Sequence, residues 1–159
     1  MALQRLVELA IVSRNTRRLK SEGAIEVGAG HYPAFVLLHA SWLLVCFFVA
    51  GVGDTQVHWL AFAAYLLLQV ARVWTIVSLG RNWTVRVLTL PGRPLIRRGP
   101  YRWVRHPNYL IVALEIPLLP LAIGAWLAAL VFGCANLVLL AYRIRIEDAV
   151  LAPRQALHE

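Results

Sequence analysis

Two charged clusters, separated by a long apolar run, hold the most reactive combinations of side chains in this 159-residue chain. Residues 99–109 read GPYRWVRHPNY, and residues 143–148 read RIRIED. The first cluster combines arginines and a histidine with aromatic rings. Because a proline disfavours a helical conformation at the preceding residue, we expect a helix to begin near Pro107, just after His106. The free N–H groups at such a helix start favour a carboxylate or a phosphate.

The second cluster lies at the end of a predicted helix whose polar residues fall on one stripe. Asn136, Arg143 and Glu147 are separated by seven and then four residues, so an uninterrupted helix places them on the same face. The stripe then runs from the apolar interior to the charged surface, like the wall of a cleft. In the alternative interpretation, the basic residues only mark the end of a membrane span and Glu147 is solvated.

Three ionisable residues lie inside the apolar runs, where a charge is costly and often functional. Arg72 shares a helical face with Gln69 and Tyr65, and it either has a function or extends its side chain to the membrane surface. Glu115 follows the first charged cluster and could pair with a nearby arginine, which makes it a candidate catalytic residue. For His39 we favour a role in helix packing.

The composition and the charge pattern indicate an integral membrane protein. Hydrophobic residues make up 60% of the chain, and the mean hydropathy is +0.64, both high for a soluble domain. Lys and Arg number five in 1–33, seven in 80–108 and three in 143–159, whereas 51–58 and 118–126 contain none. This segregation follows the positive-inside rule and places the basic segments in the cytoplasm. It argues against a nucleic-acid partner.

The apolar runs predict the membrane helices. A first span is expected over 34–50 and a second over 58–79. The stretch 109–142 contains Pro117 and Pro120, which interrupt a helix, so we expect a helical hairpin with a tight outer turn. Its first arm, of only about 13 residues, is short for a span.

The remaining segments are more polar. Residues 1–20 predict a helix that is either interfacial or the inner end of a span, and not a signal peptide. The glycine-rich segment 21–31 predicts a loop. In the polar connector 80–108, the alternation at 85–90 predicts a short hairpin or an extended loop. The two cysteines match no metal-ligand spacing, so no metal site is expected.

Together these patterns predict an all-α fold. We expect a polytopic transmembrane helical bundle of about four membrane helices, with an N-terminal interfacial or partial helix and a cytoplasmic polar connector. The chain is interpreted as one domain, 1–159. Its parts are an N-terminal helix and loop (1–33), a first helical hairpin (34–79) and a core (80–159) that holds both charged clusters.

The two clusters also carry a family resemblance. GPYRWVRHPNY, followed one apolar hairpin later by RIRIED, resembles the isoprenylcysteine carboxyl methyltransferase family, as do LGRNW at 79–83 and LPG at 90–92. The resemblance implies a pocket for S-adenosylmethionine (SAM) that is open to the cytosol and formed by the last hairpin and the polar segment before it. The chain departs from the family pattern at Asp148, where the family has a second Glu, and in its short N-terminal region.

The resemblance implies a role for several residues. Glu147 would hold the amino group of the cofactor, and Arg145 or Arg105 would orient the methyl acceptor. Glu115 completes the expected catalytic set. The expected cofactor-binding residues are His106, Pro107, Tyr109, Glu147, Tyr101 and Asn136.

The chemistry of methyl transfer fits this reading. Transfer depends mainly on holding the acceptor in line with the methyl group, and a carboxylate acceptor is already ionised at neutral pH. Such an acceptor needs an arginine rather than a general base. We therefore expect O-methylation of the carboxylate or acidic hydroxyl of a lipophilic substrate that enters from the bilayer. The substrate would be prenylated or, because the N-terminal half (RNTR at 14–17, HYP at 31–33) resembles a bacterial subset of the family, polyketide-like.

Two other functions remain open. One is a phospholipid amine N-methyltransferase or an NADPH-linked lipid reductase on a related scaffold, and the other is a non-catalytic membrane scaffold. In every case we expect the protein in the bacterial inner membrane, with its polar site facing the cytoplasm.

Overall fold

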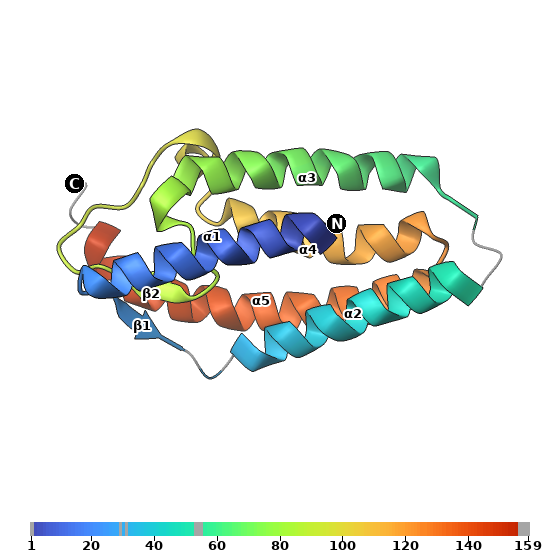
Figure 1. Ribbon diagram of the computed structural model, residues 1–159, viewed down its shortest axis with the longest axis horizontal. Coiled ribbons are helices and arrows are strands. Elements are labelled where there is room, and N and C mark those ends of the chain that lie inside the picture. Colours follow the sequence, from blue (N-terminus) through green and yellow to red (C-terminus); the bar gives the residue numbers. More distant parts are fainter. Residues whose placement is uncertain (1, 29, 31, 53–55, 156–159) are drawn as a thin grey trace.

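The computed structural model describes residues 2–28, 30, 32–52 and 56–155. Within these residues the chain forms five α-helices that lie side by side along the long axis of the molecule (Figure 1). The predicted all-α bundle is confirmed. The helices are α1 (Ala2–Ser21), α2 (Tyr32–Val52), α3 (Trp59–Leu79), α4 (Pro107–Ala122) and α5 (Trp126–Gln155).

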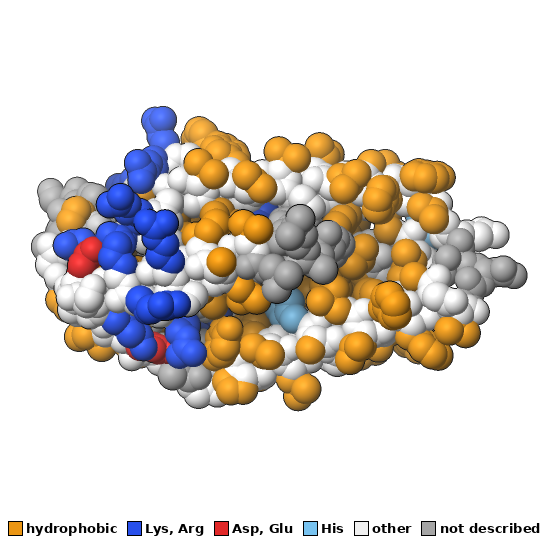
Figure 2. All heavy atoms as spheres, in the orientation of Figure 1, with side chains coloured by type: hydrophobic (Ala, Val, Ile, Leu, Met, Phe, Trp, Pro, Cys, Tyr) orange, Lys and Arg blue, Asp and Glu red, His pale blue; other side chains and the backbone are white. Residues whose placement is uncertain are grey.

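Three of these helices are long and apolar enough to cross a membrane, namely α2, α3 and α5. The fourth, α4, has only 16 residues, in line with the short arm expected from the sequence. Large apolar side chains cover the outside of the bundle, as Leu37, Phe47 and Leu60 illustrate with 72%, 81% and 86% exposure. Figure 2 shows this apolar surface along most of the molecule and a band of Lys and Arg at one end. Such a surface is stable only when lipid covers it.

The predicted helical hairpin with a tight outer turn is confirmed, because only residues 123–125 separate α4 from α5, but the two prolines that were expected to interrupt the helix lie inside it. Helix α4 continues through Pro117 and Pro120 and ends at Ala122. Pro120 has no N–H to donate to the carbonyl of Ile116, one turn earlier. The indole of Trp42 in α2 donates to that carbonyl instead, at 2.9 Å. A neighbouring helix therefore satisfies the group that the proline leaves free, as is common inside membranes.

The hydrogen bond from the Trp42 indole to the Ile116 carbonyl predicts the effect of Trp42→Phe. The variant keeps a large ring but leaves the Ile116 carbonyl buried without a donor, so we expect a loss of about 1–2 kcal/mol of stability. Thermal unfolding of the purified protein in detergent measures it. Trp59→Phe is the control, because the Trp59 side chain is 73% exposed. Equal melting temperatures for the two variants would contradict the assigned role.

A short antiparallel strand pair closes the charged end of the bundle. Strand β1 (Ile25–Val27) pairs with β2 (Val87–Thr89), with Val27 opposite Val87. Of the two forms predicted for the connector at 85–90, the structure has the extended one and not a local hairpin, because β2 finds its partner in the N-terminal loop. Glu26 of β1 lies 2.6 Å from Lys20 and also pairs with Arg86, which fixes the loop to the connector.

Helix α1 runs along the bundle between α3 and α2, and its N-terminal end lies near the middle of the molecule in Figure 1. Its direction fits the inner end of a span better than an interfacial helix. The buried Asn15 side chain donates to the carbonyls of Gly80 and Trp83 at 3.0 and 2.9 Å. Those residues belong to, or follow, the short 3-10 helix η2 (Gly80–Asn82) at the end of α3, so Asn15 attaches α1 to the bundle at the charged end.

Candidate functional site

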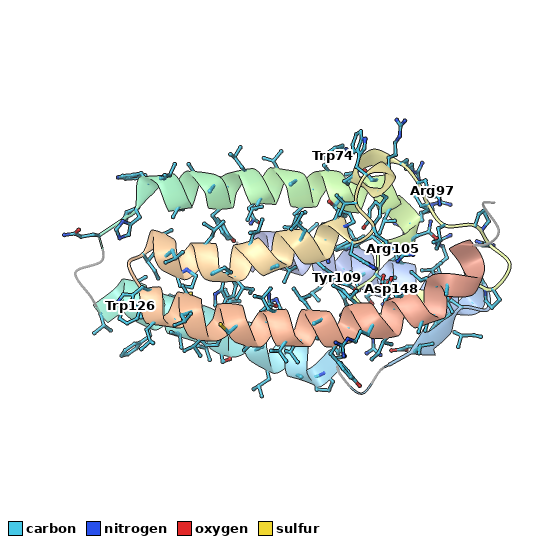
Figure 3. All side chains as sticks on the ribbon, turned by 180° about the vertical axis from the view of Figure 1, so that it is seen from behind. Trp74, Arg97, Arg105, Tyr109, Trp126 and Asp148 are labelled. Atoms are coloured by element: carbon cyan, nitrogen blue, oxygen red, sulfur yellow. The ribbon has the colours of Figure 1, made fainter. Side chains whose placement is uncertain are left out.

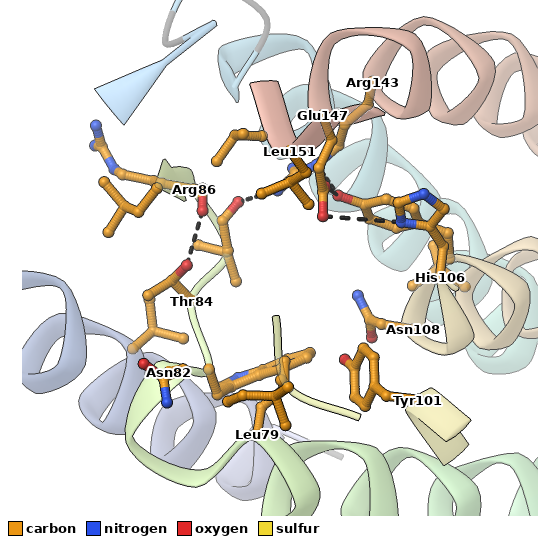
Figure 4. Close-up of a pocket in the computed structure, with 18 of the residues that line it drawn as sticks. Leu79, Asn82, Thr84, Arg86, Tyr101, His106, Asn108, Arg143, Glu147 and Leu151 are labelled. Carbon is orange, nitrogen blue, oxygen red and sulfur yellow. Dashed lines mark hydrogen bonds and ion pairs between the residues drawn. The ribbon is translucent and has the colours of Figure 1, made fainter. Parts of the chain in front are cut away.

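A cavity of about 1180 Å³ opens at the charged end of the bundle and continues toward the apolar middle. Its walls come from α1, α2, the connector, the start of α4 and the end of α5. Ligand pockets usually measure about 300–1,000 Å³, so the cavity has room for more than one small molecule. In Figure 4, Tyr101, His106, Asn108 and Glu147 surround its hollow.

The GPY segment of the first cluster forms a short 3-10 helix, η3 (Gly99–Arg102), that packs on the end of α3. Gly99 has a φ of +58°, and a Cβ there would lie 2.0 Å from the Ser78 hydroxyl oxygen. Only glycine therefore fits this contact. This contact places Tyr101 in the wall of the cavity. Burial there raises the pKa of the Tyr101 phenol, and the nearby Glu147 carboxylate raises that pKa further. Tyr101 stays protonated and can donate a hydrogen bond.

The second part of the cluster begins α4 as predicted. Pro107 is the first residue of the helix, and His106 before it has a non-helical backbone. The His106 ring stacks on Tyr109, with centroids 5.3 Å apart and 20° between the planes. Pro107 itself is buried and does not line the cavity. It starts the helix, and its contact with a cofactor stays a prediction.

The two charged clusters meet at the mouth of the cavity. The Tyr109 hydroxyl donates to the Glu147 carboxylate, and the Arg143 Nε donates to the same hydroxyl oxygen at 2.7 Å. The His106 Nε2 lies 3.0 Å from an oxygen of Asp148, and its Nδ1 lies 3.8 Å from Glu147. Figure 3, seen from behind, shows Tyr109 and Asp148 at the same end of the bundle.

Arg143 holds this arrangement in place. It is buried, and its guanidinium donates to the carbonyl of Val85 in the connector. The same group lies over the rings of Phe35 and Tyr109, at 5.3 and 5.4 Å from their centroids. Arg143 therefore joins α5 to α2, to α4 and to the connector, and it fixes the hydroxyl that Tyr109 presents to Glu147.

The deeper end of the cavity is reached by Arg72 of α3. The interpretation that Arg72 extends to the membrane surface was wrong, because its side chain is 4% exposed and forms an ion pair with Glu115 of α4. Gln69 and Tyr65 contact the same carboxylate, at 3.2 and 3.4 Å. Glu8 of α1 also lines the cavity, 3.9 Å from Arg72.

Three further residues with predicted roles do not line the cavity. Glu115 is 1% exposed and pairs with Arg72, which does line the cavity, and its assignment as a catalytic residue stays a prediction. Asn136 of α5 is fully buried and donates to the Val112 carbonyl of α4 at 3.3 Å, and its assignment to the cofactor stays a prediction. Arg145 is exposed on α5, turned about 200° from Glu147 by the helix. Its role as acceptor anchor stays a prediction.

The lining also contains polar groups that the motifs did not single out. The Asn108 Oδ1 and the Trp83 Nε1 are buried and have no hydrogen-bond partner among the described residues. An isolated acceptor and an isolated donor in one cavity fit a ligand that carries both kinds of group. Asn108 stands inside the RHPNY motif, whereas Trp83 carried no signal beyond its place in LGRNW.

Charge and shape together fit SAM. Glu147 offers a carboxylate to an ammonium, and Arg143 in the same lining offers a cation to a carboxylate. Flat rings at Tyr101, His106 and Trp83 offer surfaces to a purine. The residues present therefore suit a zwitterionic nucleoside.

Comparisons with known proteins agree with the motifs. Residues 59–153, which include α3, α4 and most of α5, match the isoprenylcysteine carboxyl methyltransferase family. The chain is 38% identical to an uncharacterized protein of Bacillus subtilis, YpbQ, over 95% of this chain and 92% of that protein. It is 28% identical to an uncharacterized protein of Haemophilus influenzae, over 93% of this chain and 88% of that one. No solved structure matches the chain.

Proposed function

Because the chain belongs to the isoprenylcysteine carboxyl methyltransferase family, a family of membrane methyltransferases, we propose that it methylates a lipophilic acceptor with SAM. The acceptor group is a carboxylate or an acidic hydroxyl. The observation that carries the proposal is the Tyr109 hydroxyl at the mouth of the cavity, which donates to Glu147 and accepts from Arg143. It joins the two family motifs in one site.

The cofactor would occupy the outer part of the cavity. Glu147 would bind its ammonium, and the Tyr109 hydroxyl keeps that carboxylate in place. Asn108 and Trp83 would give their free acceptor and donor to the nucleoside. When bound, SAM supplies an electrophilic methyl group on a sulfonium centre. The rings of Tyr101 and His106 exclude water from the region between cofactor and acceptor.

The acceptor would occupy the inner part of the cavity. Leu9 and Val12 of α1 and Val36 and Leu43 of α2 line the cavity, and an apolar chain is stable beside them. Arg72 stands at this end, held by Glu115, so it can orient an anionic oxygen. A carboxylate arrives ionised, and an acidic hydroxyl needs little help to ionise beside a guanidinium.

The same features support a location. Three helices of spanning length make the protein an integral membrane protein. The basic residues at the mouth of the cavity support an orientation toward the cytoplasm, and the bacterial relatives support the inner membrane.

Calorimetry of the purified protein with SAM and with NADPH tests the proposal. We expect SAM to bind and NADPH not to bind. Binding of NADPH alone would support a lipid reductase, and binding of neither would support a scaffold. With SAM carrying a deuterated methyl group and a membrane lipid extract, mass spectrometry identifies the product. A methyl ester is lost in mild alkali, whereas an aryl or enol ether and an N-methyl amine survive, and their fragments distinguish these two.

Arg105→Ala tests which arginine orients the acceptor. Arg105 lines the cavity and lies 3.5 Å from Asp148, so we expect kcat/KM for the acceptor to fall about tenfold while SAM affinity is kept. Arg145→Ala, assayed in parallel, tests the assignment that came from the motif. A loss confined to SAM binding in either variant would assign that arginine to the cofactor and not to the acceptor.

A further inference from the structure

A second cleft, of about 670 Å³, lies between α1 and the end of α3, outside the cavity described above. The two share no lining residue. On α1 the cleft uses positions 11, 14, 15 and 18, which form one helix face by their spacing. The cavity uses Leu9 and Val12 on another face of the same helix.

The lining of this cleft is layered. Three arginines, Arg14, Arg18 and Arg81, stand toward the charged end, and three apolar residues, Ile11, Ile76 and Val77, form the deeper part. Val77 precedes Arg81 by four residues, or about 6 Å along α3 and its extension. The candidate membrane span that contains α3 ends at Asn82. The arginines therefore lie at the depth of the lipid headgroups and the apolar residues at the depth of the acyl chains.

Arg18 is held over the cleft by its neighbours. One terminal nitrogen donates to Glu22 at 2.8 Å and the other to the carbonyl of Arg81 at 2.8 Å. Its Nε–H is buried and has no acceptor among the described residues. An N–H group fixed beside two further cations is suited to a phosphate oxygen.

We propose that this cleft binds one anionic phospholipid of the bilayer. Its phosphate lies among Arg14, Arg18 and Arg81, and an acyl chain lies along Ile11, Ile76 and Val77. The lipid fills the space between α1 and α3 on the side where Asn15 makes the direct contact. Because α1 also forms a wall of the cavity, the bound lipid supports the site without entering it.

Native mass spectrometry of the full-length protein, titrated in detergent with phosphatidylglycerol or phosphatidylcholine, tests the proposal. Arg14→Gln should weaken the first bound phosphatidylglycerol about fivefold, the effect of one headgroup-facing arginine. Arg17→Gln is the matched control, since it removes the same charge from the same helix but lies outside the cleft. It should change the affinity less than twofold. Val77→Trp, which narrows the apolar part at an exposed position, should also weaken binding.

Each other result would overturn the proposal. Equal losses in Arg14→Gln and Arg17→Gln would mean that the basic band attracts lipid only by its overall charge. Tight binding of phosphatidylcholine that does not respond to Arg14→Gln would exclude an anionic-lipid site. Displacement of the lipid by an equal concentration of glycerol phosphate would mean that the cleft binds phosphate without the acyl chains.

Discussion

Glu147→Gln is expected to bind SAM about 100-fold more weakly than the wild-type protein, because the ammonium of the cofactor loses a charged partner in a half-buried site. The amide has nearly the size of the carboxylate, and its oxygen still accepts from Tyr109. The helix and the Arg143 contacts should therefore survive. Calorimetric titration with SAM measures the affinity, and the melting temperature without ligand checks the fold.

Asp148→Asn separates this effect from a general loss of negative charge. Asp148 is the next residue on α5, and its carboxylate contacts His106 and Arg105 but does not line the cavity. Its removal should lower SAM affinity only a few fold, through a less fixed His106. Equal losses in the two variants would contradict the assignment of Glu147 to the ammonium.

Much of the fold could be predicted from the sequence because hydrophobicity alone marks membrane helices. Helices α2, α3 and α5 lie close to the expected spans, and α4 begins at Pro107 as expected. The continuation of α4 through Pro120 could not be predicted, since it depends on the Trp42 indole, 74 positions away from Ile116. The partner of β2 was missed for the same reason, because local alternation does not say which segment a strand will pair with.

The candidate site, too, could be predicted from the sequence only in part. Helical spacing places Arg143 and Glu147 on one face, and a helical hairpin brings that face to the RHPNY motif, so the meeting of the two clusters was predictable. The partner of Glu115 was not. Pairing it with Arg72 requires knowing that α3 packs against α4 at that depth. Helical spacing also placed Asn136 on this face of α5. At the position of Asn136, however, that face is buried against Val112 of α4, and it reaches the cavity only nearer the C-terminal end of α5.

The motif pair and the buried ion pair serve different parts of one cavity. At the mouth, side chains of α4 and α5 are joined by hydrogen bonds that a polar cofactor can share. At the inner end, Arg72 faces a region of α1 and α2 that is mostly apolar but also holds Glu8 and His39. A cation at this depth is costly unless paired, which explains why Glu115 is present even though it does not line the cavity.

Arg72→Met is therefore expected to destabilise the protein by about 3–5 kcal/mol, because it leaves the Glu115 carboxylate buried without its guanidinium. The melting temperature in detergent measures this loss. Adding Glu115→Leu to the same chain should restore most of the stability, since an apolar pair of similar volume often replaces a buried ion pair without cost. If the double variant is no more stable than Arg72→Met, the ion pair is not the source of the loss.

The stable double variant then separates the two roles of Arg72. If the guanidinium also orients the acceptor, Arg72→Met/Glu115→Leu should bind SAM with nearly wild-type affinity, because Glu147, Tyr109 and Arg143 are untouched. Methyl transfer should still fall about 100-fold, the usual cost of a misplaced reactant. Recovery of both stability and methyl transfer would mean that Arg72 serves only as the partner of Glu115, and the acceptor anchor would then be Arg105 or Arg145. Because stability and methyl transfer are expected to respond differently in this variant, the experiment distinguishes a structural role of the Arg72 charge from a role in orienting the acceptor.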